Sequence, residues 1–186
     1  MPIASTIILA LALGISAMLL LHRCSEQSTI QLLPGIGVVA ATAVIHTLLF
    51  WLGQFVGSML SFQSEEDPTR YTDVNSYIFL GLTAIIVLKM LAPYLRREPR
   101  LPVFDLTQHL AVLAMAVSTG TNVLLIGVGV GFVGSSSPIA LLVATLVLGT
   151  LGLMFGRQKV ELRPRRWMII ASVLLLGVAI AAVINA

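Results

Sequence analysis

Long apolar runs, separated by short polar segments, set the pattern of this chain. Six stretches are apolar for about 18 residues or more, the length that a helix needs to cross roughly 30 Å of hydrocarbon. They extend over Ile3–Leu21, Leu32–Phe62, Asn75–Leu95, Thr107–Phe132, Pro138–Gly156 and Trp167–Ile184. The pattern predicts an all-α integral membrane protein with six transmembrane helices, in one transmembrane domain over residues 1–186.

The second and fifth runs resemble each other. Residues 41–53, ATAVIHTLLFWLG, return as residues 144–156, ATLVLGTLGLMFG. A weaker match superposes Ala10, Gly14 and Ser16 on Ala116, Gly120 and Asn122. The chain is therefore predicted to hold two related three-helix repeats, about 1–95 and 107–186, with a linker at about 96–106. Coincidence between leucine-rich helices is the alternative.

Composition and charge agree with a membrane location and predict an orientation. The chain is 58% apolar and 10% charged, with a mean hydropathy of +1.00, far outside the range of soluble domains. Basic residues gather in the first, third and fifth loops, which predicts that these loops are cytoplasmic and both termini are outside. They are Arg23, Arg96, Arg97, Arg100, Arg157, Lys159, Arg163, Arg165 and Arg166. Three helices per repeat then give the repeats opposite orientations.

The basic excess does not indicate a nucleic-acid partner. The sequence pI of about 9.5 follows from cytoplasmic basic residues and from attraction to anionic lipid. The lipid bilayer is thus the expected partner, and whether copies form a homo-oligomer is open. Cys24 is the single cysteine, so it can form no intramolecular disulfide.

Polar residues within the runs are the candidates for a binding site, because each costs free energy in lipid unless it faces protein or water. His46 and Thr47 lie midway along the second run, and Thr121 and Asn122 lie in the fourth. An imidazole there can bind a metal or a proton. Neutral hydrogen bonding between helices is the alternative for His46 and Asn122. Ser16 occupies the position in the first run that matches Asn122.

Lys89 is the basic residue within the third run. Its ammonium group can reach the headgroups, or it can turn inward and bind a partner there.

Several segments resemble the MntP-type manganese efflux pumps, small bacterial inner-membrane proteins with six helices in two three-helix repeats. The segments are Ser118–Asn122, Ile126–Gly129 and Thr150–Arg157, with further likeness over Leu9–Ser16, Ala43–Gly57 and Asn75–Met90. Lys89 stands where that family has arginine. The resemblance implies a secondary transporter in a bacterial inner membrane that exports manganese or another divalent cation.

The resemblance also implies three intramembrane carboxylates, which this chain replaces. Ser16, His46 and Asn122 stand where the family has aspartate, glutamate and aspartate. Neutral donors bind hard divalent ions weakly, and an imidazole favours borderline ions such as zinc over manganese. Any metal at His46, Asn122 and Ser16 would be transported cargo, and no cofactor is expected.

Function classes other than divalent cation efflux stay open. An exporter of a small organic solute such as an amino acid, of the LysE-like kind, is one alternative by fold analogy. A membrane scaffold that does not transport is another. The sequence shows no paired acids and no Ser/His pair of the kind that would indicate an enzyme. A transporter should expose Ser16, His46, Thr121 and Asn122 to a hydrated cavity, whereas a scaffold should satisfy them in helix contacts.

Overall fold

The computed structural model describes residues 1–27, 31–61, 68–95 and 103–186, and it is helical throughout these ranges apart from short connections. Its helices are α1 (Ile3–Gln27), α2 (Leu32–Leu60), α3 (Pro68–Leu95), α4 (His109–Val133), α5 (Pro138–Arg157) and α6 (Pro164–Ile184). All six are long and apolar enough to cross a membrane, and the described residues contain no strand. The predicted all-α, six-helix class is confirmed.

Helix ends depart from the predicted spans where polar residues continue or interrupt a helix. α1 runs on to Gln27, beyond the apolar run, because His22 and Ser25 are buried there and bond to the carbonyl oxygens of Val160 and Leu153. α4 begins at His109 instead of Thr107, because Thr107 belongs to a turn closed by Asp105. α5 and α6 begin at Pro138 and Pro164, where a missing N–H costs no helix hydrogen bond. Most of the predicted linker, with Arg96, Arg97 and Arg100, lies outside the described residues.

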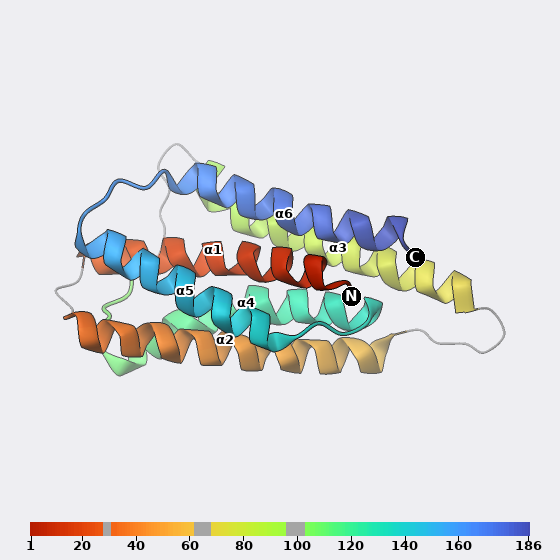
Figure 1. Cartoon of the computed structure of the whole chain (residues 1–186), viewed down its shortest axis with the longest axis horizontal. Helices are drawn as coiled ribbons and strands as arrows, with labels where there is room; N and C mark the ends of the chain where they lie inside the picture. Colours follow the sequence, from red (N-terminus) through yellow and green to blue (C-terminus); the bar gives the residue numbers. More distant parts are fainter. Residues whose placement is uncertain (28–30, 62–67, 96–102) are drawn as a thin grey trace.

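The helices lie side by side in one bundle (Figure 1). α1 packs against α5 and α6, α2 against α4 and α5, and α3 against α4 and α6. Exchanging α1 with α4, α2 with α5 and α3 with α6 leaves this set of pairs unchanged. The start of α1 and the end of α6 lie at one end of the bundle, called here the Met1 end. The opposite end, where α5 finishes, is called the Arg157 end.

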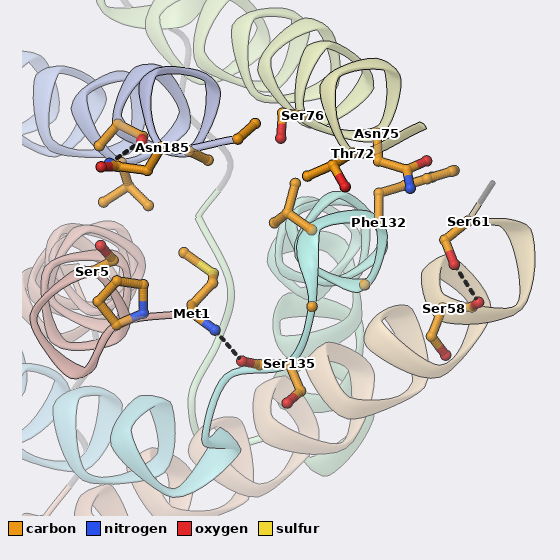
Figure 2. A pocket seen from close by; sticks show the side chains of 18 residues that line it. Met1, Ser5, Ser58, Ser61, Thr72, Asn75, Ser76, Phe132, Ser135 and Asn185 are labelled. Carbon is orange, nitrogen blue, oxygen red and sulfur yellow. Dashed lines mark hydrogen bonds between the residues drawn. The ribbon is translucent and has the colours of Figure 1, made fainter. Parts of the chain in front are cut away.

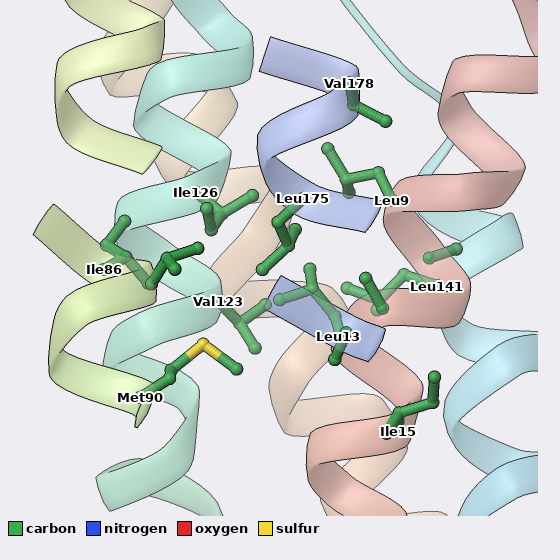
Figure 3. Close-up of a cluster of buried hydrophobic side chains, with 14 of the residues drawn as sticks. Leu9, Leu13, Ile15, Ile86, Met90, Val123, Ile126, Leu141, Leu175 and Val178 are labelled. Carbon is green, nitrogen blue, oxygen red and sulfur yellow. The ribbon is translucent and has the colours of Figure 1, made fainter. Parts of the chain in front are cut away.

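A cluster of apolar side chains, called here the central cluster, fills the space between helices (Figure 3). Leu13 of α1, Ile86 of α3, Val123 and Ile126 of α4 and Leu175 of α6 are all buried in it. These residues come from four helices and both halves of the chain. The central cluster therefore ties the first three helices to the last three.

Glycines bring two pairs of helices into backbone contact. A Cβ atom at Gly57 of α2 would clash with the Val128 carbonyl oxygen, and one at Gly131 of α4 with that of Gln54. On the other side of the bundle, a Cβ at Gly156 of α5 would clash with a carbonyl oxygen of α1. Small residues at such positions let helix backbones approach closely, which is how helices associate where water does not drive them together.

We predict that Gly131→Ala destabilises the fold, because its methyl group can be accommodated only by moving α4 away from α2. The expected loss is about 1–3 kcal/mol, the usual range for overpacking a tight contact. Gly81→Ala and Gly177→Ala are matched controls, since a Cβ at either position meets nothing within 4 Å. Thermal unfolding in detergent measures all three, and equal midpoints for Gly131→Ala and the controls would contradict the prediction.

Candidate functional site

Several helices carry, near their middle, a buried polar atom without a hydrogen-bond partner. Among the described residues there are five such side-chain atoms, and each belongs to a different helix. They are His46 Nδ1, Thr83 Oγ1, Asn122 Oδ1, Thr145 Oγ1 and Ser172 Oγ, called here the mid-helix polar set. Buried polar groups in proteins are normally paired, so each of these atoms calls for a partner such as water, an ion or a solute.

His46 is the most chemically capable member of the set. Its side chain is 1% exposed, and its Nε2 lies 3.0 Å from Thr119 Oγ1. The Thr119 hydroxyl donates a hydrogen bond to the Met115 carbonyl oxygen, at 2.9 Å. With its hydrogen engaged there, Thr119 Oγ1 accepts from the ring, which favours the tautomer with the proton on Nε2. Nδ1 is left with a buried, unpartnered lone pair that can take a proton or a metal ion.

The absence of a side chain at Gly120 leaves space for the His46 ring beside α4. A Cβ at Gly120 would clash with the Leu49 side chain and would lie 3.5 Å from His46 Cδ2. Because Gly120 has no side chain, α2 can place the imidazole against the α4 backbone, next to Thr119. The predicted importance of this stretch of α4 thus has a packing basis.

The other buried or half-buried candidates differ in their hydrogen-bond partners. They are Asn122, Ser16 and Thr47. Asn122 is half-buried and its Oδ1 has no partner. Ser16 Oγ donates to the Leu13 carbonyl oxygen at 2.7 Å, and Thr47 Oγ1 donates to that of Ala43 at 2.7 Å. The hydroxyl hydrogens of Ser16 and Thr47 are thus engaged within their own helices, although their oxygens can still accept.

Thr121 and Lys89, two other candidates from the sequence, are exposed on the outer surface of the bundle. Thr121 Oγ1 donates to the Ser118 carbonyl oxygen at 2.8 Å, in its own helix. Thr119, two residues earlier, is the threonine that reaches His46. Helical spacing from the buried Met115 and Val123 would have favoured Thr119.

Three members of the mid-helix polar set were missed in the sequence. Thr83, Thr145 and Ser172 are common hydroxyl residues, which usually bond to their own helix backbone and so do not stand out. Their unbonded state is visible only in the structure. The sequence repeat matches Thr145 with Thr42. Thr42 Oγ1 donates to the Val38 carbonyl oxygen, however, whereas Thr145 Oγ1 has no hydrogen-bond partner.

Metal-ligating side chains are not clustered in the part of the chain that the structure describes. No group of three or more His, Cys, Asp or Glu side chains that could hold a metal ion occurs there. His46 supplies one imidazole nitrogen, and the rest of the mid-helix polar set supplies neutral oxygens. Such a set can bind a cation weakly or hydrogen-bond to a polar solute.

A polar contact that the sequence did not suggest fixes the connection between α4 and α5. Gln54 Nε2 donates to the Ser136 carbonyl oxygen at 3.1 Å, and the Ser136 backbone N–H donates to Gln54 Oε1 at 3.1 Å. Both residues are buried. The glutamine amide group thus both donates to and accepts from the backbone of Ser136, and it anchors this loop to α2.

A cavity of about 660 Å³ opens beside this loop at the Met1 end (Figure 2). Its lining includes hydroxyl and amide side chains, among them Ser5 of α1, Ser76 of α3 and Asn185, which follows α6. Ser76 is only 3% exposed, and Figure 2 shows its hydroxyl directed into the cavity. The cavity lining does not include His46 or Asn122, so the cavity ends short of the mid-helix polar set.

Comparisons with known proteins assign no family. The chain matches no family model, and no curated protein or solved structure matches it. The likeness to MntP-type pumps therefore depends on the sequence motifs alone, and the functional argument depends on the site.

We predict that Thr119→Val destabilises the fold by about 1–3 kcal/mol, because it removes the Oγ1 acceptor that lies 3.0 Å from the buried His46 Nε2. Thr121→Val is the matched control, since its hydroxyl bonds only within α4 on the exposed surface. Thermal unfolding measures stability, and ¹⁵N NMR of labelled histidine reports the tautomer. A His46 signal showing the proton on Nδ1 in the parent protein would refute the hydrogen-bond assignment.

Proposed function

We propose that this protein is a secondary membrane transporter whose binding site lies at the level of the mid-helix polar set. One observation carries the proposal: five helices each place a buried, unpartnered polar atom near their middle. In lipid, such atoms are costly unless a ligand or water satisfies them. Transporters keep their binding groups near the middle of the membrane, at the interface between repeats.

The outer surface of the bundle supports insertion in a membrane. Large apolar side chains are exposed all along the helices, including Leu33, Leu88, Leu110, Ile139 and Val173. A water-soluble protein of this size would bury many of them. Arg23, Arg157 and Arg163 lie at the Arg157 end, which we assign to the cytoplasmic side of a bacterial inner membrane. The Met1 end would then face outward.

The packing supports two inverted repeats. The set of helix pairs is unchanged when the halves are exchanged, as an inverted repeat requires. Glycine contacts agree in kind. A Cβ at Gly53 or Gly57 of α2 would clash with the Leu124 or Val128 carbonyl oxygen of α4, and one at Gly152 or Gly156 of α5 would clash with that of Met18 or His22 of α1. Met18 and His22 match Leu124 and Val128 in the register that matches Ser16 with Asn122, although the contacts pair Gly57 with Gly156, one turn from the sequence match of Gly53 with Gly156.

The donor atoms suggest a weakly held cation as the transported solute. His46 Nδ1 offers a nitrogen lone pair, while Asn122 and the three hydroxyl members offer neutral oxygens. This mixture suits a borderline divalent ion such as zinc better than manganese, which prefers carboxylates. The same atoms could hydrogen-bond to a small organic solute. His46 would also bind a proton, which would couple transport to pH.

A second candidate function is a scaffold that does not transport. The central cluster favours it, because apolar side chains of α1, α3, α4 and α6 fill the interior (Figure 3). Ser16 and Thr47 also bond within their own helices. In a transporter this packing represents a closed state, whereas in a scaffold it would be permanent.

We predict that His46→Ala and Asn122→Leu each lower the transport rate at least about tenfold, because each removes an atom that binds the solute. Proteoliposomes with Zn²⁺, Mn²⁺, Co²⁺, Cd²⁺ or a basic amino acid provide the measurement. Thr121→Val is the control and should transport at the parent rate. Movement of none of these solutes by the folded parent protein would favour the scaffold.

We also predict that the combined variant Ser16→Asp, His46→Glu, Asn122→Asp gains manganese transport. Three carboxylates would supply the anionic oxygens that a hard divalent ion requires. Manganese tolerance of cells expressing the variant is the measurement, with Thr121→Asp as a control for an acid placed on the same helix but outside the interior. A folded triple variant without any gain would refute the assignment of these three positions to one site.

A further inference from the structure

A short segment before α4 is inserted into the bundle at the Arg157 end. This segment, residues 103–108, is called here the strap. Leu106 is 3% exposed although it lies outside any helix. Its side chain belongs to a cluster, called here the inner cluster, with residues of four helices. They are Leu21, Cys24, Val38, Val39, Val112, Met115 and Leu153.

One carboxylate shapes the strap. Asp105 Oδ1 accepts hydrogen bonds from the Thr107 backbone N–H at 3.0 Å and from Thr107 Oγ1 at 2.7 Å, and Oδ2 accepts from Gln108 Nε2 at 3.1 Å. These bonds hold the pKa of Asp105 below its ordinary value, so the carboxylate stays ionised. The turn that they close carries Leu106 between two bonded residues. Asp105 thus acts as a clasp that fixes the direction of Leu106.

Open space adjoins the strap on its other side. A cavity of about 700 Å³ between α2 and α4 is lined by Leu106 and Thr107 together with Gly37, Ala41 and Ile45. Its lining is mostly apolar. Leu106 therefore has space beside apolar side chains into which it can move when it leaves the inner cluster.

The two ends of the bundle differ in how they are closed. Each end has a cavity of similar size, but the one of about 660 Å³ at the Met1 end includes several hydroxyl and amide side chains, whereas the one of about 700 Å³ beside the strap is mostly apolar. At the Arg157 end the inner cluster, with Leu106 inserted, packs α1, α2, α4 and α5 together. A transport path must be closed at one end while it is accessible from the other.

We propose that the strap is the inner gate of the transport path, which opens when Leu106 leaves the inner cluster and is held shut by the Asp105 clasp. This inference depends on the proposed transport function. It identifies residues 103–108 as the element that controls access to the mid-helix polar set from the Arg157 end. Asp105 is a positioning residue, since it acts through Leu106 and contacts no solute.

Cys24 provides a built-in reporter for the gate. It is the single cysteine of the chain, it is fully buried in the inner cluster, and the Phe104 backbone lies beside its thiol. Its burial shields it from thiol reagents, and movement of the strap, whose Phe104 backbone lies beside it, would uncover it. The rate of modification therefore measures how often the gate opens.

The test is the rate of Cys24 modification by N-ethylmaleimide in the folded full chain in proteoliposomes. Asp105→Asn weakens the clasp and should raise the rate about fivefold, and Leu106→Ala removes the plug and should raise it at least about tenfold. Glu161→Gln is the matched control, because it removes an exposed carboxylate near the same end without touching the strap. Its rate should equal that of the parent chain.

Global unfolding is separated from gate opening by a second cysteine position. In a chain with Cys24→Ser and Ala179→Cys, the thiol lies in the central cluster, where Ala179 is fully buried. Asp105→Asn should leave the modification of this thiol unchanged. A rise at Ala179→Cys equal to the rise at Cys24 would mean that the variants loosen the whole fold, and the gate would be overturned.

The outcomes also separate the gate from the transport function. Unchanged Cys24 rates in both strap variants, with solute transport intact in the parent chain, would overturn the gate alone. Faster Cys24 modification in a chain that moves no solute would instead overturn the transport function, and the gate would fall with it.

Discussion

Close contact between helix backbones is the constraint on which the rest of the structure depends. Gly57 and Gly131 let α2 and α4 approach until carbonyl oxygens occupy the space that a Cβ would need. That approach places the His46 ring against Gly120 and within 3.0 Å of Thr119. With larger residues at the glycines, the helices would stand apart and the imidazole would lose its acceptor. The position of the His46 ring is therefore a consequence of the glycines that let the backbones of α2 and α4 come into contact.

The same packing leaves polar atoms unsatisfied, which would be a defect in a protein selected for stability alone. His46 Nδ1, Thr83 Oγ1 and Ser172 Oγ are buried near the middle of three helices without partners. Threonine and serine in a helix can bond to their own backbone, as Thr42 and Thr47 do, so the lack of such bonds at Thr83 and Ser172 has no local cause. Water, an ion or a solute would satisfy these atoms, which agrees with the proposed transport function.

The sequence predicted the six helices well, because length and apolarity are local properties that each run carries by itself. It also predicted His46 and Asn122 as site candidates, since polar residues stand out in apolar runs. It could not separate Thr119 from Thr121, because α4 is rich in small residues around these threonines and shows little contrast between its faces. Gln54 and Leu106 were missed for a different reason. Their roles depend on Ser136 and on the inner cluster, which lie far away in the sequence and come close only on folding.

The two ends of the bundle are closed by different kinds of contact, and this difference bears on which end can open. At the Met1 end, Gln54 holds the α4–α5 connection through two hydrogen bonds in a buried setting, and breaking them would leave polar groups unpaired. At the Arg157 end, the strap is held by a solvent-exposed carboxylate and by the insertion of one leucine beside an apolar cavity. Moving that leucine breaks no buried hydrogen bond. The strap is thus the easier element to move, whereas the cavity at the Met1 end ends short of the mid-helix polar set.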